Sequence, residues 1–580
     1  MKIRRIEIHN FRSFIDASLE AYDYTMIVGA NNAGKSTIIN ALRAFYDEIK
    51  WSNNDFPKTG SNDEESWIAL TFELLQSEWD SLADKYKVGV LDKLLTVRRY
   101  FKATEREVKA NQSNIYAVIN GATETDLFYG AKNVGTAKVG SIIYIPALTT
   151  PGEQLKTTGP SPLRNMLNFM LKRVVSKSQA YQELSNAFGK LNDEARNKDG
   201  FLSEISDPIN RAIEGWNIKL DMSVNSVSPE EISKSLVKYA FVDEILGDAA
   251  FDLDRYGHGF QRSFIYELIK IAPSFKDSTP QTKKEFNPDF TLILFEEPEA
   301  FLHPGQQENM AYHLRKLGSE PGQQVIVTTH SPLFVGKVAD EIGQIVRVQR
   351  QNGVSKIYQP KGDQIQSIFK EGFSLSNKLQ EFVDNPAIDK SKKKDAIAML
   401  ATAPDEDIAL NEEKFRYQLW LDSERAAMFF ADRVLLVEGP TEKALFHYLL
   451  ARDWHDLTRH KTVVIDAIGK YNFHRFIALF SAFGIPYGVM IDDDDDKNHH
   501  KAINELIYEC KNEFSLGEPV KFKGCLEKYL GLSVPKRDDK KPLEILKAIT
   551  IGSIKSDLLE LLRRDFISAL GLDKTESISD

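Results

Sequence analysis

A chain of 580 residues with 42% hydrophobic and 27% charged residues has an ordinary globular composition, and its length predicts three or four domains. The net charge of −10 argues against a uniformly basic nucleic-acid coat, although local patches or bound metal ions can still meet phosphates. Two cysteines cannot form a disulfide framework, and no apolar run approaches the roughly 18 residues that span a bilayer. We therefore expect a cytoplasmic protein without a signal peptide or membrane segment.

The first chemical motif is the glycine-rich loop GANNAGKS at residues 29–36. An apolar run at 25–28 precedes it and predicts a strand, and residues 37–42 predict a helix. This context suits a phosphate loop, because backbone amides and a helix N-terminus both attract an anion. Lys35 would then reach the β- and γ-phosphates of ATP, and Ser36 would hold Mg²⁺; the alternative is a glycine turn that fits the pattern by chance. The residues expected to bind the nucleotide are Asn31, Gly34, Lys35, Ser36 and Thr37.

The next region contains more strand candidates and then changes character. Strand-like runs occur within 66–75, 94–119 and 141–146. From about residue 150 to 240 the apolar residues take helical spacing, as at Met166, Phe169, Met170 and Val174. We interpret this stretch as a helical insertion.

A fully apolar strand candidate at 290–295 runs directly into acidic residues. This is the Walker B arrangement, in which Glu296 would lie near Mg²⁺ and Glu297 would polarise the attacking water. A second apolar strand candidate, 324–329, ends at His330. A lone histidine is often structural, but its place after the Walker B strand favours a sensor of the γ-phosphate.

Two further stretches allow a functional and a plain interpretation. Gly257 and Gly259 come before a predicted helix, and they form either a second anion-binding turn or a simple helix cap. Residues 360–430 are charged and predominantly helical, and we interpret them as a bridge to a second module. Their basic run at 389–395 is either a solvated linker or a DNA contact.

The second module places carboxylates after two predicted strands. Glu438 follows the apolar run 434–437, and Glu442 falls in the first turn of the next helix, with Thr441 expected as its N-cap. The helix dipole alone would explain Glu442 but not Glu438. A strand at 487–491 ends in five aspartates, of which Asp492 and Asp494 would face one side. A plain acidic loop is the alternative; a site for Mg²⁺ or Mn²⁺ fits the strand-end position and the oxygen ligands.

The front part of the chain resembles an ABC-type ATPase of the repair and chromosome-maintenance group. The resemblance rests on NFRSF at 10–14, the loop at 29–36, the glycine turn at 257–262, EEPE at 296–299 and TTHSP at 328–332. In that family the signature turn of one subunit caps ATP held by the other, so the resemblance implies a homodimer or higher homo-oligomer. This chain departs from the family in having Glu296 where aspartate is usual and in a degenerate signature turn.

The back part resembles a Toprim domain, and the combination resembles the OLD (overcoming lysogenisation defect) family of nucleases, which includes the nuclease subunit of the Gabija anti-phage system. The resemblance implies two metal ions. Glu438, Asp492 and Asp494 would hold one, and Glu442 the other. It also makes Glu527 a ligand of the second metal and Lys547 a catalytic lysine, for which Lys555 competes.

The fold class expected is therefore α/β, an ABC-type ATPase domain with a helical insertion followed by a C-terminal Toprim domain. The segments expected are 1–150 and 246–360 for the ATPase, 151–245 for the insertion, 361–430 for the linker and 431–580 for Toprim. The function expected is an ATP-regulated, metal-dependent DNA endonuclease in anti-phage defence. The alternatives are a repair ATPase with a non-nucleolytic Toprim module, a topoisomerase or primase, and a nucleotide-sensing scaffold. A co-encoded helicase or a reverse transcriptase with its DNA remains open as a partner.

Overall fold

The computed structural model describes residues 1–88, 92–110, 112–147, 178–197, 200–216, 286–300, 302–335, 339–401, 406–494 and 498–572, with scattered positions between 171 and 271. The chain forms two compact units. The first unit holds residues 1–2, 74–88 and 138–325, and the second holds residues 3–73, 89–137 and 326–580. No helix in the described part is both long and apolar enough to cross a bilayer.

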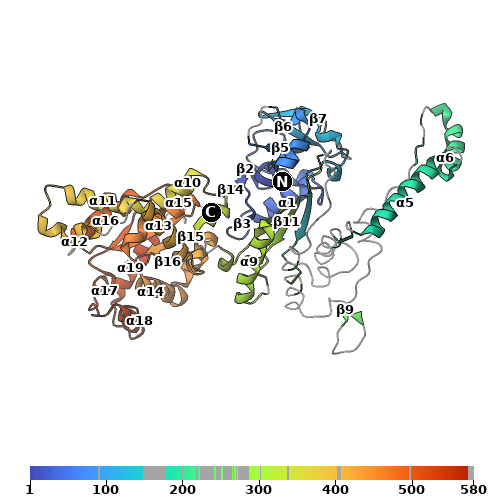
Figure 1. The fold of residues 1–580 in the computed structure, drawn as a ribbon. Helices are drawn as coiled ribbons and strands as arrows, with labels where there is room; N and C mark the ends of the chain where they lie inside the picture. Colours follow the sequence, from blue (N-terminus) through green and yellow to red (C-terminus); the bar gives the residue numbers. More distant parts are fainter. Residues whose placement is uncertain are drawn as a thin grey trace. The chain divides into compact units, whose positions relative to one another are not determined.

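The second unit begins with a six-stranded sheet (Figure 1), in the order β2-β1-β4-β5-β6-β7. Alternate residues such as Ile6, Ile8, Ile68 and Leu70 are fully buried, because period-two patterning sends them to one face. Helix α1 contacts this sheet through β4 and buries Ile38, Ile39 and Leu42. The elements are β1 (Lys2–Phe11), β2 (Phe14–Glu20), α1 (Lys35–Phe45), β4 (Ser66–Glu73), β5 (Leu94–Lys102), β6 (Ile115–Ile119) and β7 (Ala122–Leu127).

A mostly parallel sheet carries the phosphate loop. In the second unit β14, β13 and β3 lie side by side in that order, followed by the end of β12 at residues 326–328, and β3 pairs in parallel with β13. Every residue of β3 and of β12 is buried, as expected for parallel strands covered on both faces. The predicted strands before the loop and before His330 are thus confirmed. The strands are β3 (Tyr24–Val28), β12 (Gln323–Thr328), β13 (Ile345–Gln351) and β14 (Val354–Tyr358).

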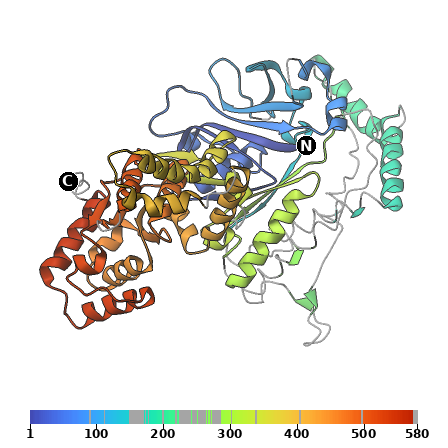
Figure 2. The same ribbon diagram turned by 60° about the vertical axis from the view of Figure 1, so that its left-hand side comes forward.

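The first unit contains the Walker B strand. β11 (Thr291–Glu296) is buried along its length and pairs in parallel with β8 (Ser141–Ile145). The long helix α9 (Pro304–Ser319), yellow-green in Figure 2, begins at Pro304 with His303 as its N-cap. The insertion includes the contacting helices α5 and α6, whereas Met166, Phe169 and Met170 lie outside the described residues. Other elements are α2 (Gln76–Ser81), α5 (Gln179–Arg196), α6 (Phe201–Ala212), β9 (Phe241–Val242) and β10 (Ala250–Phe251).

Among the described residues of the second unit, four helices follow the ATPase strands, as the charged helical pattern predicts. One buried ion pair joins the last of them to the C-terminal part. Arg475 donates through Nε and an Nη to both carboxylate oxygens of Glu413, at 2.6 and 2.7 Å. Such a paired geometry is needed where two charges are buried together. The helices are α10 (Asp363–Lys370), α11 (Gly372–Asp384), α12 (Lys394–Ala401) and α13 (Glu406–Trp420).

The C-terminal part, orange to red in Figure 1, is built on an open parallel sheet in the order β16-β15-β17-β18. Helices α14 and α19 contact its strands, and α14, α18 and α19 share one apolar core that includes Phe446, Trp454 and Phe566. The strands are β15 (Arg433–Val437), β16 (Thr462–Asp466), β17 (Tyr487–Asp492) and β18 (Val520–Phe522). The helices are α14 (Pro440–Arg452), α15 (Phe473–Ala482), α16 (Asn498–Glu509), α17 (Leu526–Tyr529), α18 (Lys541–Thr550) and α19 (Ser556–Ala569).

Candidate active site

The phosphate loop is held open by glycines and by its own lysine. Gly29 has φ 140°, and a Cβ there would overlap the carbonyl oxygen of Val348 in β13. Gly34 has φ 116° and caps α1, so the loop leads directly into a helix N-terminus. Lys35 Nζ donates to the carbonyl oxygens of Gly29 and Ala30, each at 2.9 Å. The buried ammonium therefore faces the inside of the loop, where a phosphate would meet it.

A hollow of about 330 Å³ borders the same loop. Asn32, Gly34 and Thr37 line it, and the cations on its walls are Arg12, Lys58 and Arg350. Asn31 and Ser36 are solvent-exposed in the described structure. Three cations next to a helix N-terminus form an environment suited to an anionic ligand.

His330 lies in the second unit together with the phosphate loop. Thr329, its neighbour, donates its backbone N–H to the carbonyl of Ile27 in β3, at 3.2 Å. Burial and the positive charge of Lys35 lower the pKa of His330 to about 4. His330 is therefore neutral at physiological pH, and its ring can donate one hydrogen bond without adding charge.

The residues predicted to form Walker B, Glu296 and Glu297, belong to the first unit. Glu296 is the last residue of β11 and accepts a hydrogen bond of 2.7 Å from the hydroxyl of Tyr144. Glu297 follows with φ 45°, a conformation uncommon outside glycine that re-aims the chain at the strand end. Gly257 and Gly259, which the sequence assigns to the signature turn, lie outside the described residues.

The Toprim-like sheet brings its carboxylates to one edge. Glu438 follows β15, and Asp492 ends β17, which is the parallel neighbour of β15. β16 lies on the other side of β15, so the strand order reverses between β15 and β17. Open parallel sheets bind their ligands at such a reversal, beyond the carboxyl ends of the strands. The backbone of Asp492 favours the ionised form of Glu438 and so opposes the effect of burial on the pKa of Glu438.

The first turn of α14 corrects one local expectation. The N-cap is Gly439 and Pro440 is the first helical residue, so Thr441 is not the cap. Proline is favoured at this position because the N–H it lacks would have no helical partner. Glu442 accepts a hydrogen bond of 3.0 Å from the Gly439 N–H, which holds this buried carboxylate at the helix start.

A buried lysine lies within the carboxylate cluster. The side chain of Lys470 is 1% exposed, and its Nζ lies 2.8 Å from Asp494 Oδ2 and 3.9 Å from Glu438 Oε2. It also donates to the carbonyl oxygen of Asp492 at 2.5 Å. His500 Nδ1 is 2.8 Å from the same Asp494 oxygen, and Tyr471 contacts the Nε2 of His500 at 3.2 Å. Asp494 is thus fixed from two sides.

The pKa values divide the carboxylates into two kinds. Burial and the charges of Glu442, Glu438 and Asp494 raise the pKa of Asp492 to about 9. Burial, with a contribution from Glu438 and Glu527, raises the pKa of Glu442 to about 7, and burial also raises the pKa of Glu438. Burial would raise the pKa of Asp494 too, but hydrogen bonds from His500 and Lys470 hold it below its usual range. The cluster therefore has more negative charge than its surroundings neutralise.

A bound divalent cation would neutralise this excess of negative charge. Glu438 Oε2 is buried and accepts no hydrogen bond from the described residues, which leaves a hard oxygen available as a ligand. Within the described ranges, no three His, Cys, Asp or Glu side chains already converge at metal-ligand spacing. The Lys470 ammonium lies 2.8 Å from the carboxylate of Asp494 and 3.9 Å from that of Glu438. The donor set suits Mg²⁺ or Mn²⁺; Asp495 and Asp496 lie outside the described residues.

The remaining predicted residues lie on the side of α17 and α18. Glu527 is 3% exposed, and its charge acts on Glu442, so it belongs to the same cluster. Lys547 is exposed, and its ammonium lies 3.2 Å from Glu544 rather than on a cluster carboxylate. Lys541 is affected by both Glu527 and Asp492: burial lowers its pKa, but Asp538 and these two carboxylates raise it overall.

Sequence reasoning missed Lys470, His500 and Lys541. A signal for Lys470 was present, because it follows Gly469, which has φ 98° and turns the chain beyond β16. His500 comes six residues after Asp494 on the next helix, and nothing in that spacing shows that its ring turns back. Lys541 lies one residue before the predicted helix start, among several lysines that only the packing of α17 and α18 distinguishes.

This fold and this edge of carboxylates define a class of protein, an ATPase with a phosphate loop joined to a Toprim domain. Comparison with protein families agrees with the class. Residues 1–138 and 156–335 match the AAA ATPase domain, and residues 429–494 match the "Overcoming lysogenization defect protein-like, TOPRIM domain". The chain belongs to the AAA ATPase family and carries the OLD-like Toprim domain, as the sequence resemblance predicted.

Several named proteins are similar to this chain over most of its length. The "Old nuclease" of Escherichia phage P2 is 24% identical over 533 residues, covering 88% of this chain and 81% of that protein. The "Endonuclease GajA" of Bacillus cereus (strain HuB5-5) is 22% identical over 600 residues, covering 87% and 79%. A solved structure, "Crystal structure of the SmcHead bound to the C-winged helix domain of ScpA", shares 15% identity with a TM-score of 0.35, covering 63% of this chain and 100% of that chain.

Proposed function

We propose that this protein is a divalent-metal-dependent DNA endonuclease whose activity is regulated by ATP. The observation that carries the proposal is the carboxylate cluster at the β15/β17 edge, where Glu438, Asp492 and Glu442 have raised pKa values and Asp494 is held ionised. The names of the relatives, nuclease and endonuclease, support it. Bacterial anti-phage defence and a cytoplasmic setting are proposed on the family resemblance.

The roles proposed for the residues of the carboxylate cluster follow from the chemistry of their side chains. Glu438, Asp492 and Asp494 would hold one cation, and Glu442 and Glu527 would hold a second. Bound cations supply an activated water and stabilise the leaving oxygen of the phosphodiester. Lys470 and His500 orient Asp494, because each contacts the same carboxylate oxygen at 2.8 Å. Lys547, or Lys541 at the start of the same helix, neutralises charge that develops on the phosphate.

The ATPase part is proposed to bind ATP through Asn31, Gly34, Lys35, Ser36 and Thr37. Glu296 would hold Mg²⁺, Glu297 would polarise the attacking water and neutral His330 would sense the γ-phosphate. Gly257 and Gly259 of a second copy would cap the nucleotide, which makes the active form a homodimer or a higher homo-oligomer. We propose segments 1–150 and 246–360 for the ATPase, 151–245 for an insertion, 361–430 for a linker and 431–580 for the nuclease. A co-encoded helicase or reverse transcriptase with its DNA is a further proposed partner.

The test is plasmid cleavage with Mg²⁺ or Mn²⁺, with and without ATP. We expect Glu438→Ala to reduce cleavage at least about a hundredfold and to weaken Mn²⁺ binding measured by calorimetry. Lys35→Ala should abolish ATP binding and the effect of ATP on cleavage while leaving Mn²⁺ binding unchanged. Glu560→Ala, at an exposed carboxylate on α19, is the matched control and should behave as the wild type.

Two results would contradict the proposal. Wild-type protein that binds ATP and Mn²⁺ but leaves DNA intact would indicate a repair ATPase with a non-nucleolytic Toprim module. Cleavage that persists in Glu438→Ala at the wild-type rate would place the chemistry elsewhere in the chain.

A further inference from the structure

A cavity of about 560 Å³ lies beside the carboxylate cluster, on its α17 and α18 side. Glu527 forms part of its wall, and the backbone N–H of its neighbour Leu526 donates to Asp492 Oδ1 of the cluster at 3.1 Å. The cavity therefore adjoins the proposed cleavage site. Its other walls come from residues 532–537 and from α18 with the turn that follows it.

The polar wall of this cavity is basic, although the chain as a whole is acidic. Four cations line it, Lys536, Arg537, Lys540 and Lys547, against the two carboxylates of Glu527 and Glu544. Arg537 is bound by Asp539 at 2.7 Å, and Lys547 by Glu544 at 3.2 Å. Lys536 and Lys540 are exposed and form no ion pair with a described carboxylate. These two ammonium groups are the ones available to an anionic ligand.

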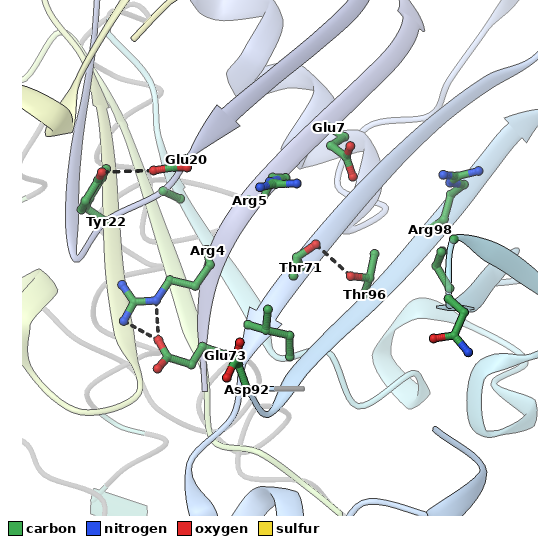
Figure 3. Close-up of a pocket in the computed structure, with 15 residues that line it drawn as sticks. Arg4, Arg5, Glu7, Glu20, Tyr22, Thr71, Glu73, Asp92, Thr96 and Arg98 are labelled. Atoms are coloured by element: carbon green, nitrogen blue, oxygen red, sulfur yellow. Dashed lines mark hydrogen bonds and ion pairs between the residues drawn. The ribbon is translucent and has the colours of Figure 1, made fainter. Parts of the chain in front are cut away.

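A larger hollow on the N-terminal sheet serves for comparison, because acidic and basic groups on its wall offset one another. It measures about 790 Å³, and Figure 3 shows Arg4, Arg5 and Arg98 lying among Glu7, Glu20, Glu73 and Asp92. Arg4 pairs with Glu73, and the hydroxyl of Tyr22 donates to Glu20 at 3.2 Å. Its acidic and basic groups offset one another, so it offers a polyanion little attraction.

The second wall of the cavity beside Glu527 is apolar and partly open to solvent. It is formed by Leu532, Pro535, Ile545, Ala548 and Ile551. Ile551, directly after α18, is 76% exposed, whereas Ile545 and Ala548 of α18 are buried. An exposed isoleucine at a cavity wall offers a flat apolar ligand a surface to cover. The backbone of a regular duplex has no such flat face, whereas an unstacked base does.

We propose that this cavity binds one unstacked nucleotide of the DNA strand, next to the phosphodiester that is cut. The base covers Ile551 and the apolar wall, and the flanking phosphates meet Lys536 and Lys540. The inference rests on the proposed function only in taking the ligand to be DNA. It predicts that the protein prefers single-stranded or locally unpaired DNA over a regular duplex.

Binding without cleavage tests this inference apart from the nuclease proposal. The probes are a fluorescein-labelled 15-nucleotide single strand and the blunt duplex of the same sequence, followed by anisotropy with the full-length protein in Ca²⁺. The plot of log K for single-strand binding against the logarithm of the salt concentration has a negative slope. Lys536→Gln with Lys540→Gln should make that slope less steep by about 1.4. Ile551→Ser should weaken single-strand binding about fivefold and duplex binding less, because only the unstacked base covers that side chain.

Matched control variants separate local from general effects. Lys356→Gln with Lys370→Gln removes the same charge from exposed positions on β14 and α10, and Leu419→Ser removes an apolar side chain that is 75% exposed on α13. Both should bind as the wild type does. An equal loss in the test and control variants, or single-strand binding within twofold of wild type in both test variants, would overturn the inference. Loss of binding in the test variants alone would support it even if the protein cuts no DNA.

Discussion

Arg347 offers the most demanding test of how the ATPase strands are joined to the Toprim domain. It lies in β13, next to Val348, whose carbonyl oxygen packs against Gly29 of the phosphate loop. Its guanidinium is 2% exposed and donates to three backbone carbonyls, those of Phe483 at 3.1 Å, Gly484 at 2.7 Å and Ala431 at 3.2 Å. These carbonyls come just before β17, which ends at Asp492, and just before β15, which Glu438 follows.

The perturbation is Arg347→Met, which keeps the length of the side chain and removes all donors. Each buried carbonyl left without a donor costs about 1–3 kcal/mol. Part of this is offset, because burial already lowers the pKa of Arg347 to about 10 and the variant no longer buries that charge. We expect a net loss of about 3 kcal/mol in the free energy of unfolding. Arg347→Lys should lose less, since an ammonium keeps the charge but reaches fewer of the carbonyls.

The assay combines urea unfolding, followed by tryptophan fluorescence, with cleavage in the presence and absence of ATP. Trp454 lies in the core of the C-terminal part and reports on its unfolding. Under conditions where Arg347→Met stays folded, the effect of ATP on cleavage should fall while ATP binding persists. A variant within about 1 kcal/mol of wild type, with the ATP effect unchanged, would refute the role of this arginine.

Two further predictions concern stability. Burial, with the charge of Arg475, holds the pKa of His474 well below its ordinary value. As the pH falls below about 6.5, this histidine therefore takes up a proton in the unfolded chain but not in the folded one, and the free energy of unfolding decreases. Between pH 6.5 and pH 5 the wild type should lose about 2 kcal/mol more than His474→Phe in urea unfolding, and parallel pH profiles would contradict this. Gly484 has φ 59°, and a Cβ there would overlap the ring of Tyr358, whereas Gly121 has φ 80° and open space. Gly484→Ala should therefore lower the thermal midpoint well beyond Gly121→Ala, and equal shifts would count against the clash.

The strands and the phosphate loop follow from local sequence. Strand β3 is buried at every residue, and Gly29 and Gly34 after it have positive φ angles that other residues adopt at a cost. The acidic residues after β11, β15 and β17 could be placed because a buried strand delivers its next residue to the carboxyl edge of the sheet. The fold class was predicted correctly on these grounds. The cap of α14 was not, because Gly439 and Thr441 both suit a helix start and only the backbone geometry distinguishes them.

By itself, the sequence located a lysine in a glycine loop and carboxylates at the ends of buried strands, and we propose that these groups carry the chemistry. Only the tertiary structure decided what surrounds them. It placed the Lys470 ammonium and the His500 ring on one oxygen of Asp494, and it gathered Lys536, Lys540 and Ile551 around a cavity beside Glu527. The physical reason is distance along the chain. The repeat that sends side chains to one face of a strand or helix depends on a few neighbouring residues. Charge and burial depend on groups that folding brings together from distant parts of the chain.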